Sequence, residues 1–136
     1  MTRTERALVA LLRIGGLVTL SALGAVVMPH AWMDAIHRAL GLGDLPETPI
    51  VGYLTRSLSG MYAMHGALLL FLSCNVRRYL PAIRLMALLC IAFGAGTLVL
   101  DLYVGLPRAW AWSEGPSVVV LGTVLAWLAW RVSDEG

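Results

Sequence analysis

The chain has 136 residues, of which 59% are hydrophobic and 13% charged, and its mean hydropathy is +0.79. Soluble domains carry about 25% charged residues, so we expect much of this apolar surface to face lipid rather than water. The formal net charge of +2 comes with dispersed Arg residues and no basic face, which argues against nucleic acid as a partner.

The sequence predicts four membrane-spanning helices within a single domain that covers residues 1–136. A hydrocarbon core of about 30 Å needs about 20 residues of helix. We expect spans at residues 7–28, 49–74, 82–105 and 114–131. The fourth is the shortest, and it crosses only if it is counted from Ser113. The first is long for the apolar region of a signal peptide, so we expect it to be retained.

The connection between the first two spans contains a predicted amphipathic helix at residues 30–40. Its expected apolar side consists of Trp32, Met33, Ile36 and Leu40, and its polar side of His30, Asp34, His37 and Arg38. We expect this helix to lie flat on the outer membrane surface or to cap the bundle, with a solvated polar side. Gly41 is expected to end it. Thr48 is a predicted N-cap for the second span, and Pro49 suits the first helical position.

The Arg residues predict the orientation of the chain, because all ten basic residues are Arg. Those expected on one side of the membrane are Arg3, Arg6, Arg13, Arg77, Arg78, Arg84 and Arg131. Those expected on the other side are Arg38, Arg56 and Arg108. Since the side richer in Arg is normally the cytoplasmic one, both termini and the 75–82 loop are predicted to be cytoplasmic.

Each predicted span carries a stripe of small or weakly polar residues at helical spacing. In chain order the stripes are Gly15, Thr19 and Ala22; Ser59, Ala63 and Ala67; Ala87, Cys90, Gly94, Thr97 and Asp101; and Gly122 and Ala126. Helices in lipid associate through close packing and polar contacts, which small residues permit. The predicted fold is therefore an all-α integral membrane protein, an antiparallel four-helix bundle with a short amphipathic interfacial helix in its first outer loop.

Asp101 stands in the apolar stretch TLVLDLYVG, where a bare carboxylate is costly. It falls on the small side of the third span, near the outer end, and Arg56 falls at a similar depth on the second span. We therefore expect an Arg56–Asp101 pair. Two interpretations stay open: a structural clamp that satisfies both groups, and a polar anchor in a pocket open to the outer leaflet.

Further polar and aromatic residues are predicted to lie near this pair. The predicted ligand-binding or structural cluster consists of Arg56, Asp101, Tyr103, Trp110, Trp112 and Glu114. A lipid-modifying membrane enzyme that uses Asp101 and Glu114 is an alternative. The sequence contains no P-loop, GxSxG, HExxH or dinucleotide-binding motif, so a non-enzymatic role is favoured.

His65 is the one His inside a predicted span, and Met61 lies four residues before it on the same helix side. A mid-membrane His can ligate haem, and Met suits copper(I). One His needs further ligands, and no other predicted span contains a second. We therefore expect a neutral His65 hydrogen-bonded to a neighbouring helix, and we predict no cofactor and no metal.

Three stretches between residues 54 and 107 carry a resemblance to known proteins: RSLSGMYAMHGALLL, RRYLPAIRLMALL and LVLDLYVGLP. They combine an Arg and a Gly-x-Tyr early in the second span, a basic turn with Pro, and an Asp near the end of the third. Over this half of its length, the chain resembles a broad group of small four-span bacterial membrane proteins. The resemblance implies four helices in a bacterial cytoplasmic membrane, and it implies no particular activity.

The expected function is that of a non-enzymatic, multi-pass membrane protein. It would bind a lipid or another hydrophobic small molecule near the outer face, or pack as a subunit of a larger membrane complex. The alternative is a small transporter or channel. Such a protein would need to be oligomeric, because the four spans of one chain enclose little volume. The expected partner is the lipid bilayer, and a homo-oligomer or a larger membrane complex would add further membrane chains.

Overall fold

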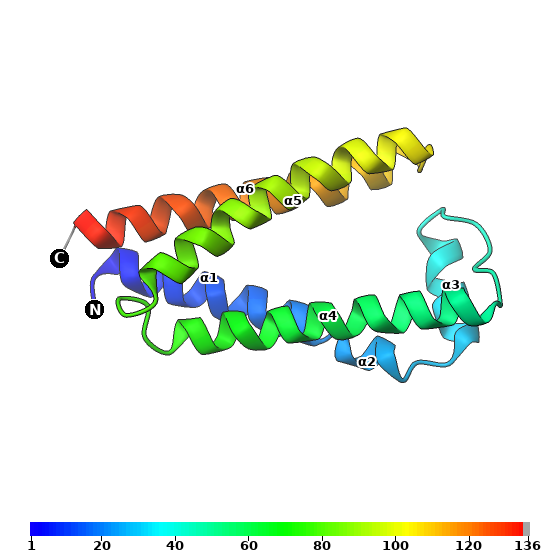
Figure 1. Cartoon of the computed structure of the whole chain (residues 1–136), viewed down its shortest axis with the longest axis horizontal. Helices are drawn as coiled ribbons and strands as arrows, with labels where there is room; N and C mark the ends of the chain where they lie inside the picture. The colour runs from blue at the N-terminus through cyan, green and yellow to red at the C-terminus, as the bar shows by residue number, and fades with distance from the viewer. Residues whose placement is uncertain (135–136) are drawn as a thin grey trace. The chain divides into compact units, whose positions relative to one another are not determined.

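The computed structural model describes residues 1–134, which are 81% helical and contain no strand. The all-α class predicted from the sequence is therefore confirmed. The helices, in chain order, are α1 (Arg3–Leu20), α2 (Leu23–Val26), α3 (His30–Ala39), α4 (Pro49–Ser73), α5 (Leu80–Val104) and α6 (Arg108–Asp134) (Figure 1).

Within the described residues, three segments are long and apolar enough to cross a membrane: Arg3–Val26, Leu80–Val104 and Arg108–Asp134. They agree with the predicted class of transmembrane protein. The helix α4 is 25 residues long but is not among the three. Its apolar sequence is interrupted by Arg56 and His65, whose side chains are costly to place in hydrocarbon. A bundle of four membrane-spanning helices thus stays a prediction.

Side chains define the first turn of two helices. Thr2 and Glu5 form a capping box, in which the Thr2 amide donates to Glu5 Oε2 at 2.7 Å and the Glu5 amide donates to Thr2 Oγ1 at 3.1 Å. At the start of α4, the amide of Val51 donates to Thr48 Oγ1 at 3.4 Å. The predicted N-cap at Thr48 is therefore confirmed, and the capping box begins α1 earlier than the apolar pattern alone predicted.

Glycines with positive φ end two helices. Gly41, with φ 74°, follows α3, where the amides of Gly41 and Leu42 donate to the carbonyls of Arg38 and His37. The predicted stop at Gly41 is confirmed. Gly105, with φ 77°, follows α5, and the Leu106 amide donates to the Asp101 carbonyl at 2.9 Å.

Two boundaries differ from the prediction. The first apolar segment is not one continuous helix, because residues 21–22 form a turn between α1 and α2. The last helix begins at Arg108 rather than near residue 114, and it carries Pro116 inside it. Amides of Trp110 and Ala111 donate to the Pro107 carbonyl, which gives α6 a first turn ahead of Pro116.

The chain divides into two compact units. The terminal unit comprises Met1–Leu12 and the chain from Leu72 onward, and the central unit comprises Arg13–Phe71. The buried apolar residues of the terminal unit are Leu8, Leu12, Leu72, Val76, Ile83, Ala87, Ala111, Leu125, Ala126, Leu128, Ala129 and Val132. In this unit the start of α1, the start of α5 and the end of α6 share one end (Figure 1).

Two Arg side chains make polar contacts at that shared end. The Arg77 guanidinium donates to Glu5, whose side chain is buried. The Arg84 guanidinium donates to the carbonyl of Ala129 at 3.5 Å. Cationic groups near the end of α6 are favourable because the carboxyl end of a helix is the negative end of its dipole.

The helices α5 and α6 pack along small residues. A Cβ atom built on Gly94 would meet the Gly115 carbonyl oxygen at 2.7 Å, and one built on Gly122 would meet the Ala87 carbonyl oxygen at 2.8 Å. The two backbones are therefore in contact, as the predicted small stripes of these spans require. Ala87, Gly94, Gly122 and Ala126 are all buried, which confirms their inward placement.

In the central unit α1 crosses α4 at a pair of glycines. A Cβ on Gly66 would meet the Gly16 carbonyl oxygen at 2.6 Å and Thr19 Oγ1 at 2.7 Å. Ala63, predicted as part of the α4 stripe, is buried, whereas Ala67 is exposed. The crossing therefore uses Gly66, one position away from the predicted Ala67.

Candidate functional site

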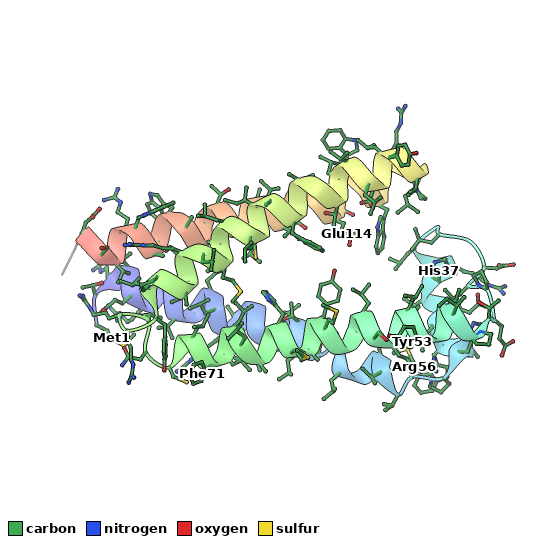
Figure 2. The ribbon with its side chains drawn as sticks, viewed as in Figure 1. Met1, His37, Tyr53, Arg56, Phe71 and Glu114 are labelled. Atoms are coloured by element: carbon green, nitrogen blue, oxygen red, sulfur yellow. The ribbon has the colours of Figure 1, made fainter. Side chains whose placement is uncertain are left out.

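An open hollow of about 520 Å³ lies in the central unit, between the start of α3 and the start of α4. The residues that line it are His30, Glu47, Thr48, Pro49, Gly52, Tyr53 and Arg56. Figure 2 labels Tyr53 and Arg56 on the half of α4 that lies beside α3. The hollow is therefore lined by an imidazole, a carboxylate, a guanidinium and a phenol. The start of α3, the start of α4 and the segment just before α4 supply these groups.

Backbone carbonyls hold the Arg56 guanidinium in place. Its Nη1 donates to the Gly52 carbonyl at 3.2 Å, and its Nη2 donates to the Met28 carbonyl at 3.2 Å. Arg56 is half-buried, and no ion pair in the described part of the chain neutralises it. A guanidinium has more N–H donors than these two contacts use. The charge of Arg56 is thus positioned at the hollow without being cancelled there.

His30 is the first residue of α3, and its Nε2 is buried without a hydrogen-bond partner within residues 1–134. A buried polar atom without a partner is costly, and such an atom often marks a place where a ligand or water binds. His30 lines the hollow together with Arg56, with its Nε2 enclosed by protein atoms rather than exposed in the hollow.

Four residues of the lining are exposed: Glu47, Thr48, Pro49 and Tyr53. The Tyr53 side chain is 66% exposed. The structure describes no ion pair of the Glu47 carboxylate. The hollow accordingly presents a free carboxylate and an accessible aromatic ring as well as the guanidinium.

Residues after α3 are braced against that helix, which fixes the approach to Glu47. Asp34 accepts a hydrogen bond from the Leu45 amide at 2.8 Å and pairs with Arg38 at 2.7 Å. His37 Nδ1 donates to the Gly43 carbonyl at 2.8 Å. The Leu45 amide, followed by Arg38, lowers the pKa of the Asp34 carboxyl, because both stabilise its ionised form. These contacts join Asp34 and His37, on the polar side of α3, to the backbone of the segment that follows the helix.

Of the predicted polar cluster, Arg56 lies in the central unit, and Asp101, Tyr103, Trp110, Trp112 and Glu114 belong to the terminal unit. Asp101 is 6% exposed, and its Oδ2 accepts no hydrogen bond from any described residue. Tyr103 is 86% exposed. Within residues 1–134, no hydrogen bond or ion pair joins the side chains of Asp101, Tyr103 and Glu114 to one another. The Arg56–Asp101 pair and the outer cluster stay predictions.

His65 lies half-buried on α4, next to the Gly66 crossing, and Met61 is 66% exposed. Across residues 1–134 no three His, Cys, Asp or Glu side chains are grouped so as to hold a metal ion. The described residues supply no additional ligand that would support a haem or copper site at His65. The role of His65 therefore stays a prediction.

Sequence reasoning missed the association of Glu47, Tyr53 and His30 with Arg56. The sequence predicts a solvated polar side of α3 for His30 and no site for Glu47. One signal was present: a carboxylate stands directly before the Thr48–Pro49 helix start, and Arg56 follows two turns later on the same helix.

Compared with known proteins, the sequence matches no protein-family model, no curated protein and no solved structure.

Proposed function

We propose that the chain is a non-enzymatic, multi-pass protein of a bacterial cytoplasmic membrane that binds a lipid in the hollow of the central unit. In this proposal α4 joins the three strongly apolar segments as a fourth antiparallel span, and the lipid bilayer is the main partner. Support for cytoplasmic termini comes from the Arg-rich end of the terminal unit, where Arg77 and Arg84 lie with the start of α1 and the end of α6.

The observation that carries the lipid proposal is the Arg56 guanidinium, fixed by two backbone carbonyls inside an open hollow and left without an acidic partner. Arg presents planar donors that suit the phosphate of a lipid headgroup. His30 lies in the same lining, although its unpartnered Nε2 is buried.

Exposed apolar residues on the same two helices supply surface for acyl chains. On α3, Trp32 and Ile36 are 65% and 50% exposed, and on α4, Ile50 and Leu54 are 61% and 55% exposed. An amphipathic helix with this composition is suited to the boundary between headgroups and hydrocarbon. A headgroup in the hollow with its chains along these residues accounts for both the polar and the apolar features.

The experiment compares lipid retained by the purified wild-type protein with that retained by Arg56→Gln. Lipid would be extracted after detergent purification and quantified by mass spectrometry, and binding would be measured by native mass spectrometry. Arg108→Gln, an exposed Arg of the terminal unit, is the matched control. Loss of a charged hydrogen-bonding group costs about 1.5–3 kcal/mol, so binding should weaken roughly tenfold or more.

The proposal would be contradicted if the Arg56→Gln variant bound lipid as well as the wild type does. It would also be contradicted if Arg108→Gln lost as much lipid binding as Arg56→Gln. Thermal unfolding in detergent is measured in parallel, so that weaker binding is attributed to Arg56 only when the variant is folded.

A further inference from the structure

The hollow contains opposite charges that are not paired with each other. Arg56 donates to the carbonyls of Gly52 and Met28, and no ion pair joins it to Glu47 within the described residues. An Arg and a Glu that line one small hollow would normally pair directly. Here the guanidinium is held by two backbone carbonyls, and the exposed Glu47 lies just before the start of α4.

We infer that the hollow takes a zwitterionic group, a phosphate joined to an ammonium as in an ethanolamine-phosphate headgroup. This inference rests on the proposed lipid-binding function and adds the headgroup class. The phosphate contacts the free N–H groups of Arg56. The ammonium contacts the carboxylate of Glu47 and the face of Tyr53.

Each contact follows from the chemistry of the lining. Guanidinium and phosphate match in geometry as well as charge. Tyr53 is 66% exposed, so its ring face is accessible to a cation. The volume of about 520 Å³ is within the range typical of small-molecule sites.

A singly charged ligand fits the lining less well. A headgroup with only a phosphate would bring negative charge near Glu47 and leave that carboxylate without a counter-ion. A purely cationic ligand would face Arg56 in the same way. Because like charges repel, a ligand that carries both signs is the one that the two side chains favour together.

The experiment is a competition by native mass spectrometry on the full chain in detergent, with three probes. Phosphatidylethanolamine and phosphatidylglycerol are compared with identical acyl chains, and soluble phosphoethanolamine is added as competitor. We expect wild-type protein to prefer phosphatidylethanolamine roughly tenfold, which corresponds to about 1.4 kcal/mol. Glu47→Gln should abolish the preference, and Asp44→Asn should keep it. Asp44 is a fair control because it lies on the same segment and pairs with Arg38 outside the hollow.

The outcomes separate the two proposals. Equal binding of both lipids by the wild type, or a preference that survives Glu47→Gln, overturns the zwitterion inference and leaves lipid binding standing. Binding of neither lipid nor phosphoethanolamine overturns both. Binding of soluble phosphoethanolamine without either lipid supports the zwitterion inference and overturns the lipid function. Glu47 is exposed, so a folded Glu47→Gln protein is expected, and thermal unfolding checks it.

Discussion

The α5–α6 pair of the terminal unit and the α3–α4 end of the central unit are built in opposite ways. In the pair, glycine and alanine bring one backbone against the other, and Gly94 and Gly115 lie in mutual contact. At the α3–α4 end, side chains such as Asp34 and Arg56 bond to backbone that is distant in the sequence, and an open hollow lies beside Arg56.

This contrast shows how one short apolar chain provides both rigidity and a site. Close packing of small residues stabilises helices in lipid without any polar group. A hollow needs looser packing than this. Long polar side chains can then fix the relative position of the elements without bringing their backbones into contact. The predictions below test whether each region depends on the interactions assigned to it.

The largest effect is expected for Gly94→Leu in the close-packed pair. The added side chain would meet backbone atoms of Gly115 and Val119, which cannot move aside without separating the helices. We expect a loss of about 3 kcal/mol or more in the free energy of unfolding in detergent, or failure to fold. Gly96→Leu is the matched control, since a Cβ on Gly96 meets nothing within 4 Å. Equal stability of the two variants would show that α5 and α6 are not packed through Gly94.

A smaller effect, of opposite sign, is expected for Asp101→Asn at the other end of α5. The carboxylate is buried, has an unpartnered oxygen and lies in the last turn of a helix, where negative charge is unfavourable. Removing the charge should leave stability unchanged or raise it by about 1 kcal/mol. Thermal unfolding in detergent measures this, with Glu114→Gln as the control.

A steep loss of stability in Asp101→Asn would instead support the clamp predicted from the sequence. In that case the double variant with Arg56→Gln would lose much less than the sum of the two single changes, because coupled residues are not additive.

The smallest effect concerns pH and the brace behind the hollow. Asp34 has a pKa below its ordinary value, so its stabilising contribution is complete above the unfolded value of about 3.9 and is lost as pH falls through the lower, folded one. Hydrogen exchange at the Leu45 amide, corrected for its intrinsic pH dependence, should accelerate in that acidic range. Asp34→Asn should accelerate exchange already at neutral pH, and Asp44→Asn should not. Unchanged exchange in Asp34→Asn would contradict this.

Local signals in the sequence predicted much of the fold. The amphipathic period gave α3, the Gly41 position gave its end, and Thr48 followed by Pro49 gave the start of α4. The small residues of α5 and α6 were correctly assigned to the packed side, because backbone contact between helices requires them at helical spacing.

The remaining features depend on contacts that local patterns do not encode. The turn at residues 21–22 interrupts a uniformly apolar segment, and Pro116 suggested a helix start although Pro107 provides an earlier one. The hollow required the start of α3 to lie beside the first turns of α4. The hydrogen bond from Arg56 to Met28, which is far away in the sequence, and the shared lining of the hollow reveal that neighbourhood.

The glycine contact between α5 and α6 also bears on permeation. Since a single Cβ on Gly94 would already collide with the opposite backbone, no hydrated ion passes along the seam between these two helices. A conducting pathway through this protein would therefore run along another face of these helices, with walls from other helices or from neighbouring copies.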